Sequence, residues 1–199
     1  MFNFPDTEKK LKSRISSYKS ALNKEKKIHG CIHDGSGKRY GLFGLSFVLG
    51  DLKGSEAYFR WYAEEFPDDI GEPTQKLCWA ISLHRMERDD EARHMLANLM
   101  LTNLYLIPRL LGQDVAEYDI WHSSNYEFID YFDYIPKEIL DCITEPERLW
   151  VQELYDSLAF RRIRKRYIEI YRELDKTRDV EARRALLDEA RSLLNTHLC

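Results

Sequence analysis

The spacing of apolar residues along this chain predicts α-helices almost throughout. Leu11, Ile15, Tyr18 and Leu22 recur three or four residues apart, which is the period of one helix face, so we expect an amphipathic helix over residues 6 to 28 with a basic outer face. Residues 29 to 37 read HGCIHDGSG, and three glycines with Asp and Ser favour a loop over a helix.

Two helical hairpins are expected next. The first runs over residues 38 to 66 and closes at Pro67, and Pro73 opens the second at a position where its missing N–H costs little. A helix over residues 89 to 106 is apolar on most sides, which predicts that it lies at the centre of the core; its apolar residues are Met95, Leu96, Leu99, Met100, Leu104 and Ile107.

The remaining chain predicts two further long helices after an irregular region. Residues 112 to 134 show no helical period, and a short helix follows Pro136. Thr144 and Glu147 have the spacing of a capping box, which begins a long helix. The apolar face of that helix comprises Phe160, Ile163, Tyr167, Ile170 and Leu174, and that of a last helix comprises Ala182, Leu186, Ala190 and Leu193.

The spacing of small and large apolar residues in segment 74 to 100 is typical of a known family of helical repeats. Ala80 and Ala92 are small residues twelve positions apart, with Leu83 and Leu96 at the adjacent large positions. The segment resembles the tetratricopeptide repeat (TPR), a 34-residue helix–turn–helix unit that packs against neighbouring copies. The resemblance implies an all-α fold of antiparallel hairpins stacked as a short TPR-like solenoid; a helical bundle with flanking helices is the alternative.

A second, weaker copy lies upstream of the first. Ala57 precedes Ala92 by 35 residues and Gly44 precedes Ala80 by 36. Gly50 supplies a turn glycine in this copy, whereas Glu87 lies near that position in the other. The resemblance therefore predicts two degenerate repeats.

Length and cysteine usage point to one domain in a reducing compartment. We expect a single 199-residue helical domain divided into 1–37, 38–112, 113–142 and 143–199. Four scattered cysteines suggest neither a disulfide framework nor a zinc ribbon. No signal-peptide core and no membrane-spanning apolar run is apparent, so the cytoplasm is the expected location.

Charge is unevenly distributed along the chain. Residues 1 to 40 hold ten Lys or Arg against four Asp or Glu, whereas residues 41 to 140 hold eight against eighteen. The chain therefore has a basic N-terminal arm and an acidic middle, and such a middle suits a basic partner.

The repeat resemblance also implies a concave binding surface. Inward-facing positions of the first helix in each hairpin would line it, namely Lys38, Leu45, Val48, Thr74, Ile81, His84 and Arg85. Lys38 and Arg85 would suit a partner carboxylate, and His84 would make binding respond to pH. The alternative is that the apolar members lie in the core while His84 and Arg85 face water.

Residues 114 to 136 form a second candidate surface, with six acids and seven aromatic residues. Aromatic side chains with a polar handle are enriched at recognition surfaces. We hypothesise that Tyr118, Asp119, Trp121 and Tyr126 contact a partner. The alternative is that Trp121, Phe128 and Phe132 fill the core while the acids face water.

No catalytic residue, metal ligand or cofactor site is assigned. Asp119, His122 and Ser123 suggest a triad, but triads are recognised by geometry, and Ser123 or Ser124 more simply caps a helix. The metal-capable group His29, Cys31 and His33 has no second ligand pair. The basic cluster at 161–166 lies within helical reach of several acids, which predicts a salt-bridged face.

These observations favour a protein–protein interaction scaffold or adaptor that binds a protein or peptide through the groove, the acidic aromatic surface, or both. A toxin-neutralising immunity-type protein is one alternative. A metal-dependent or hydrolytic enzyme built on His29, His33 and His122 is another, and homo-oligomerisation through apolar end surfaces is a third. Membrane and nucleic-acid partners are not expected.

Overall fold

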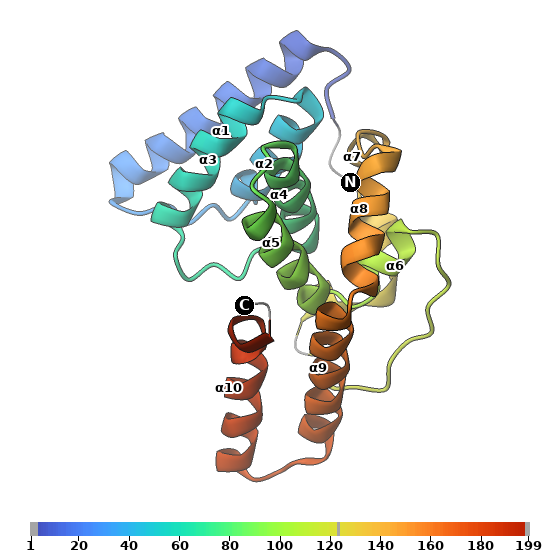
Figure 1. The fold of residues 1–199 in the computed structure, drawn as a ribbon. Coiled ribbons are helices and arrows are strands. Elements are labelled where there is room, and N and C mark those ends of the chain that lie inside the picture. The colour runs from blue at the N-terminus through green and yellow to red at the C-terminus, as the bar shows by residue number, and fades with distance from the viewer. Residues whose placement is uncertain (1–3, 123, 198–199) are drawn as a thin grey trace. The chain divides into compact units, whose positions relative to one another are not determined.

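The fold consists of α-helices packed against one another (Figure 1). The structure, a computed structural model, describes residues 4–122 and 124–197, and the regular elements of that part are all helical, which confirms the predicted all-α class. The elements are α1 (Glu8–His29), α2 (Lys38–Leu49), α3 (Leu52–Glu65), α4 (Pro73–Arg85), α5 (Asp89–Thr102), α6 (Leu106–Leu110), η1 (Asn125–Glu127), η2 (Ile129–Tyr134), α7 (Lys137–Asp141), α8 (Glu145–Asp156), α9 (Leu158–Lys176) and α10 (Val180–His197).

The helices group into two compact units. The first comprises Met1–Ala92 and Ile135–Ile143, and the second comprises Arg93–Tyr134 and Thr144–Cys199. The chain therefore passes between the units three times, once within α5. These boundaries differ from the predicted divisions after residues 112 and 142, and the expectation of one domain stays a prediction.

Helix α2 is the central element of the first unit. It packs against α1, α3, α4 and α7, and residues 42 to 47 are buried all round the helix. The Phe43 ring contacts aromatic rings from α3 and α4, those of Tyr58, Phe59, Tyr62 and Trp79. Gly44 allows another close approach, because a Cβ there would lie 3.1 Å from Ile139 Cδ1 of α7 and 3.2 Å from Phe4 Cζ.

The turns that follow α2 and α4 each contain a left-handed residue. Gly50 ends α2 with φ 71°, where glycine is favoured, while Glu87 follows α4 with φ 59°. Pro73 occupies the first turn of α4, as predicted. The chain therefore turns at Gly50 and near Glu87, where the sequence predicts turns.

Burial at the repeat-like positions differs between the two hairpins. Ala80, Leu83, Ala92 and Leu96 are all buried. In the upstream copy, however, Ala57 is exposed and Ser55 is 2% exposed, so Ser55 is the small residue that α3 turns inward. The resemblance to the tetratricopeptide repeat stays a prediction, and the downstream hairpin carries it.

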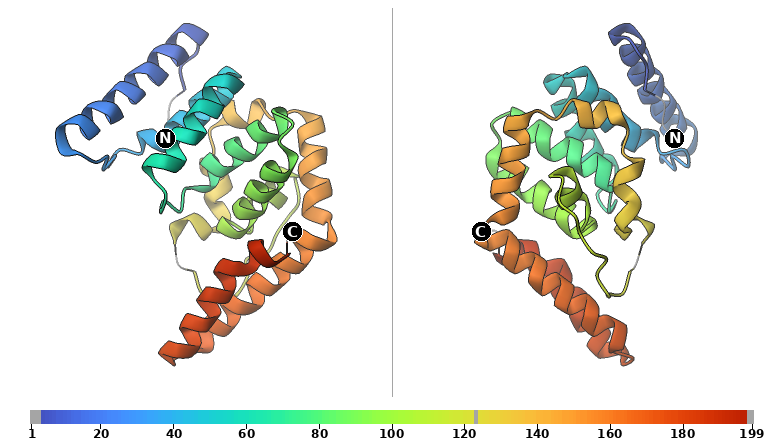
Figure 2. Two further views of the ribbon diagram at one scale, coloured as in Figure 1. Left: turned by 60° about the vertical axis from the view of Figure 1, so that its left-hand side comes forward. Right: turned by 90° about the vertical axis from the view of Figure 1, so that its right-hand side faces the viewer.

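The second unit contains α6, η2, α8, α9 and α10. Figure 2 shows α9 and α10 as an antiparallel pair, and Arg166 joins them through two hydrogen bonds to Glu189. The predicted apolar face of α9 is confirmed, because its members are all buried: Phe160, Ile163, Tyr167, Ile170 and Leu174. The capping box of Thr144 and Glu147 at the start of α8 is confirmed as well.

Two predicted helices are shorter than expected. The helix predicted to reach residue 106 ends at Thr102, because the Asn103 side-chain oxygen accepts hydrogen bonds from the N–H groups of Tyr105 and Leu106 and starts α6. The long helix predicted after Thr144 breaks at Ser157, which has ψ 154° and whose hydroxyl accepts the Phe160 N–H. Among the helices of the described residues, none is long and apolar enough to cross a membrane.

Candidate protein-binding groove

The structure closes much of the predicted concave surface. Leu45 and Ile81 have no exposed surface, so the expectation that they line an open groove is corrected: both are core residues. The physical reason is that α2 and α4 pack directly against each other. Val48 and Thr74 keep partial exposure.

The charged residues of the predicted surface are engaged within the first unit. Arg85 donates a hydrogen bond of 2.7 Å to the Cys142 carbonyl, and its guanidinium lies 4.4 Å from the centre of the Phe47 ring. His84 lies 3.4 Å from Asp89, and the Lys38 ammonium donates to the Ser36 hydroxyl. Arg85 therefore bonds to the segment that contains α7, so its guanidinium is already engaged within the unit.

An open groove lies elsewhere in the first unit, between α1 on one side and the end of α2 and α3 on the other. Its wider part, of about 660 Å³, is lined by Lys12, Ile15, Ser16, Lys19, Ser20, Asn23, Leu49 and Asp51. Its narrower part, of about 210 Å³, shares Lys19 and Asn23 and adds Ala57, Tyr58 and Trp61. We call these two parts together the α1–α3 groove.

Aromatic rings form the floor of the narrower part. The rings of Tyr58 and Trp61 stack with centroids 5.3 Å apart and an interplanar angle of 27°. The Lys19 ammonium lies 5.6 Å from the centre of the Tyr58 ring, a distance at which a cation and a ring attract. The groove thus combines apolar area with a positive charge at its edge.

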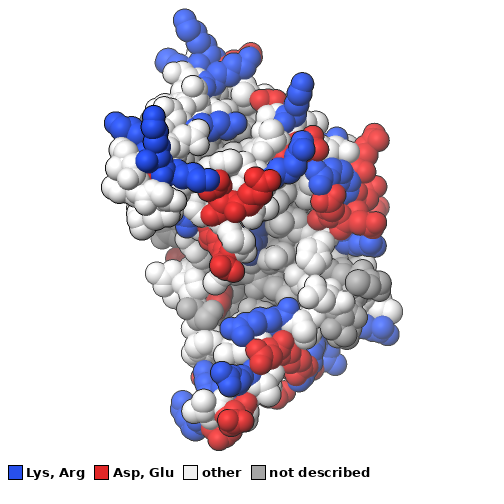
Figure 3. Space-filling model, turned by 90° about the vertical axis from the view of Figure 1, so that its left-hand side faces the viewer, with Lys and Arg blue, Asp and Glu red and all other residues white. Residues whose placement is uncertain are grey.

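The electrostatic character of the groove comes from α1. This helix carries eight Lys or Arg against two Glu, and Figure 3 shows basic side chains projecting from the upper part of the face where α1 lies. Asp51, the acid in the groove lining, is engaged at the start of α3, where it accepts the Gly54 N–H. The sequence reading missed this groove, because it assigned the cations of α1 to solvent.

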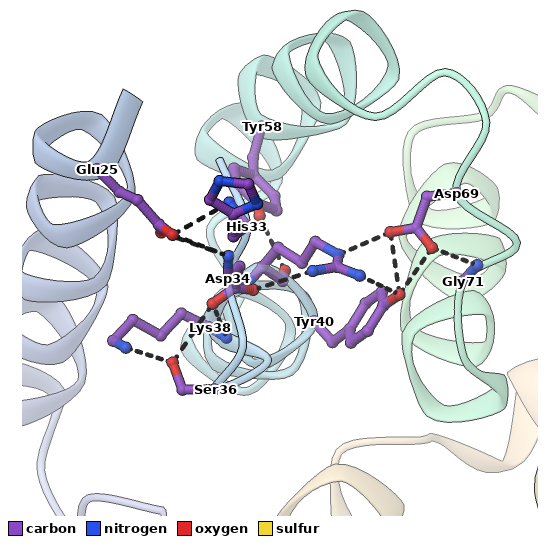
Figure 4. Close-up of polar contacts among 10 residues, drawn as sticks. Glu25, His33, Asp34, Ser36, Lys38, Tyr40, Tyr58, Asp69 and Gly71 are labelled. Atoms are coloured by element: carbon purple, nitrogen blue, oxygen red, sulfur yellow. Dashed lines mark hydrogen bonds and ion pairs between the residues drawn. The ribbon is translucent and has the colours of Figure 1, made fainter. Parts of the chain in front are cut away.

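A network of polar contacts holds the loop between α1 and α2 in place (Figure 4). Glu25 of α1 accepts hydrogen bonds from the backbone N–H groups of His33 and Asp34. Asp34 in turn accepts the N–H groups of Lys38 and Arg39 at 2.9 and 2.8 Å. A carboxylate is favoured at a helix N-terminus, so Asp34 caps α2 where Gly37 offers no side chain.

The network continues from α2 to the loop before α4. Arg39 Nε donates to Asp69 at 2.7 Å, and the Tyr40 hydroxyl donates to the same carboxylate. The Gly71 N–H also donates to Asp69. Burial would raise the pKa of Asp69, but these hydrogen bonds outweigh it and hold the pKa below its usual value.

Tyr58 connects the network to the groove. Its hydroxyl donates to the Arg39 carbonyl at 2.8 Å, and burial raises the pKa of that hydroxyl. The ring of the same residue forms the groove floor. Glu25 on α1 and Tyr58 on α3 are therefore both fixed to the start of α2, which sets the positions of the groove walls.

Two ionisable groups lie beside this network at the start of α4, namely Glu72, the partly buried N-cap residue, and Lys76, which is buried. Burial raises the pKa of Glu72 to about 7 and lowers the pKa of Lys76 to about 8. The Tyr62 hydroxyl is buried without a hydrogen bond of normal geometry, although Asp69 and Gln75 lie near it. Shifted pKa values are a recurring feature of active sites. Here Glu72 caps α4 in a capping box with Gln75, which accounts for its position structurally.

Residues 114 to 134 of the predicted acidic aromatic surface belong to the second unit, and several of its aromatic residues pack there. Tyr118 stacks on Tyr105 with centroids 5.6 Å apart, and its N–H donates to the Tyr105 hydroxyl. Trp121 stacks on Tyr171 and lies beneath the guanidinium of Arg183.

The buried Asn103 fastens the same segment. It donates to the Tyr126 and Phe128 carbonyls. Asp119 is exposed, as are Phe128 and Tyr134. Trp121 is thus partly buried in packing, whereas the expectation that Phe128 fills the core is wrong.

The other two candidate constellations are Asp119, His122 and Ser123, and the group His29, Cys31 and His33, in which Cys31 Sγ lies 3.4 Å from His33 Nε2. Ser123 lies outside the described residues, and His122 lies 3.5 Å from Glu127. Ser124 caps η1, which agrees with the prediction that Ser123 or Ser124 caps a helix. No group of three or more His, Cys, Asp or Glu within 4–122 and 124–197 is placed to hold a metal ion.

The basic cluster at 161–166 is largely paired, as predicted. Arg166 bonds to Glu173 and Glu189, and Lys165 lies 4.0 Å from Glu169. Arg164 lies 3.9 Å from the Tyr155 ring centre. This face is therefore a salt-bridged helix surface.

Comparison of the sequence with protein-family models, with curated proteins and with solved structures finds no match in any of the three.

Proposed function

We propose that this chain is a cytoplasmic protein-binding module whose α1–α3 groove receives a segment of a partner protein. The observation that carries the proposal is the aromatic floor of the groove, where Tyr58 and Trp61 stack beside the open side of α1. Tyr and Trp at the base of a recess are the residues that most often anchor protein partners. The function proposed is recognition, as an adaptor or scaffold, rather than catalysis.

The support around the groove favours binding by a preorganised surface. Hydrogen bonds of the polar network hold both α1 and α3 to the start of α2. A rigid recess loses little conformational entropy when a ligand enters, so more of the contact energy appears as affinity. The TPR-like downstream hairpin is part of this proposal as scaffold, because α4 packs on α2 and α3 behind the groove.

The acidic aromatic surface is a weaker candidate. The rings of Tyr118 and Trp121 are partly covered by stacking on other rings of the second unit, which leaves less of their area for a partner. Exposed Asp119 can steer a basic partner, but the recess lined by its neighbours Ile120 and His122 holds only about 10 Å³. We therefore place recognition at the α1–α3 groove.

The test fills the groove without touching the core. Ala57 is exposed and lines the narrower part, so Ala57→Trp should block it while leaving the fold intact. Ala185 is an exposed alanine of α10 in the other unit, and Ala185→Trp is the matched control. Both variants are first compared with wild type by thermal unfolding.

Affinity capture from native lysate then compares the three chains. Proteins retained by wild type and Ala185→Trp but lost from Ala57→Trp would support the proposal. Equal retention by all three chains would overturn it, because a blocked groove would then have no effect on recognition.

A further inference from the structure

We propose that the ligand of the α1–α3 groove is a short acidic amphipathic helix of a partner protein. This inference rests on the proposed function and names its ligand class. It draws on three features of the groove: its length, its apolar floor and the sign of its charge.

The length of the groove matches a few helical turns. Its wall on α1 runs from Lys12 to Asn23, which corresponds to about 16 Å at 1.5 Å per residue. A ligand helix of about three turns presents apolar side chains at positions i, i+4 and i+7, the usual anchors of a helix held in a groove. One turn beyond Asn23, the ion pair between Lys26 and Glu65 joins α1 to α3.

The floor offers apolar area at both ends of this length. Ile15 and Leu49 line the wider part and are each half-buried. Tyr58 and Trp61 line the narrower part. An incoming apolar face would therefore meet aliphatic contacts at one end and aromatic contacts at the other.

Lys19 sets the charge preference at the centre of the groove. It belongs to both parts of the lining, and within the described chain no carboxylate pairs with it. Lys12, by contrast, is paired with Glu8. A ligand carboxylate beside Lys19 would gain an ion pair over an apolar floor, where water screens the charges less.

The apolar floor distinguishes a peptide from other anionic ligands. A nucleic acid binds mainly through ion pairs between its phosphates and cationic side chains, so the apolar side chains of Ile15 and Leu49 would add little to its affinity. A membrane surface requires an exposed apolar face, whereas Tyr58 lies at the bottom of a recess and is 2% exposed. Nucleic acid and anionic vesicles are therefore outcomes that the test must separate.

The probe is a designed amphipathic peptide of about 16 residues, close to the shortest length that supports some helix in water. It carries Leu and Trp on one face and Glu on the other, and a matched peptide carries Lys in place of Glu. Each is titrated into ¹⁵N-labelled full-length protein while amide shifts are followed by NMR. A short single-stranded RNA and vesicles with anionic lipid are titrated in the same way.

We expect the acidic peptide to shift the amides of Lys19, Asn23, Ala57 and Trp61, and the basic peptide to bind at least about tenfold more weakly. Lys19→Glu should weaken the acidic peptide about tenfold, whereas Lys24→Glu, an exposed lysine of α1 outside the lining, should weaken it no more than about twofold.

Other outcomes would overturn the inference. Equal binding of both peptides, equal effects of the two lysine variants, or stronger shifts with RNA or vesicles would each exclude an acidic helix as the ligand. If Ala57→Trp still loses lysate partners in that case, the proposed function stands and only the ligand class fails. If Ala57→Trp loses nothing, both fail together.

Discussion

Glu72 is a partly buried acid at the start of α4 whose neutral form the fold favours. Burial raises the pKa of its carboxyl from an ordinary value near 4.5 to about 7, although the nearby charge of Arg39 opposes that change. The folded state therefore binds a proton that the unfolded chain releases between pH 4.5 and 7, so the Glu72 contribution to stability is lost as pH rises through that window. Lys76 acts in the opposite direction above pH 8, where its lowered pKa makes stability rise with pH.

Replacing Glu72 by Gln should remove this penalty while keeping an oxygen to cap α4. We expect the free energy of unfolding of Glu72→Gln to exceed that of wild type by about 1 to 3 kcal/mol at pH 7.5, and by much less at pH 4.5. Urea unfolding of both proteins at the two pH values measures the difference, and equal gains at both would contradict the raised pKa.

At the scale of elements, local side-chain chemistry decided which boundaries could be predicted. The start of α8 was predictable because Thr144 and Glu147 form a recognisable capping box. The breaks at Asn103 and Ser157 were not, because the apolar period continues across both, and each side chain caps the following helix only once the chain turns there.

The groove was less accessible to sequence reasoning than the helices that form it. Ile15 and Tyr18 share the predicted apolar face of α1, yet both are only half-buried, whereas Leu11 and Leu22 on that face are buried. Periodicity gives the direction of a face but not the distance of the next helix. That distance depends on non-local contacts such as the hydrogen bond from Tyr58 to the Arg39 carbonyl.

Arg85 shows how an element can be fastened by one side chain. Its hydrogen bond to the Cys142 carbonyl joins α4 to the end of the segment that contains α7. We expect Arg85→Met to keep the aliphatic packing, to lower the free energy of unfolding by about 1 to 3 kcal/mol, and to speed amide exchange across residues 135 to 143.

Hydrogen–deuterium exchange with mass spectrometry measures the amide exchange of residues 135 to 143 directly. The matched control is Arg60→Met, because Arg60 is exposed and its ion pair with Glu56 is long at 3.8 Å, so we expect a change below about 0.5 kcal/mol. Unaltered exchange at 135–143 in Arg85→Met would leave Arg85 available for a partner, as the sequence first suggested.

At the scale of the whole molecule, the first unit is discontinuous in sequence. Segment Ile135–Ile143 belongs to it and buries three isoleucines, Ile135, Ile139 and Ile143. We expect a chain ending at residue 92 to unfold at a clearly lower temperature than the same chain joined to residues 135–143 by a Gly/Ser linker of about 15 residues.

Circular dichroism melting compares the two chains. A third chain, in which the appended segment carries Ser in place of its three isoleucines, separates apolar burial from the mere presence of the linker. If the three midpoints coincide, the segment contributes nothing to the unit.

The close approach of Ile139 to Gly44 also has a consequence for biosynthesis. A ribosome makes α2 early, yet α7 is complete only after the whole stretch from residue 50 to 141 has been added, a delay of roughly 5 to 18 s at ordinary elongation rates. Throughout that interval the glycine-bearing side of α2 has no cover from α7, so a chaperone that binds exposed apolar helix faces would meet the nascent chain there first.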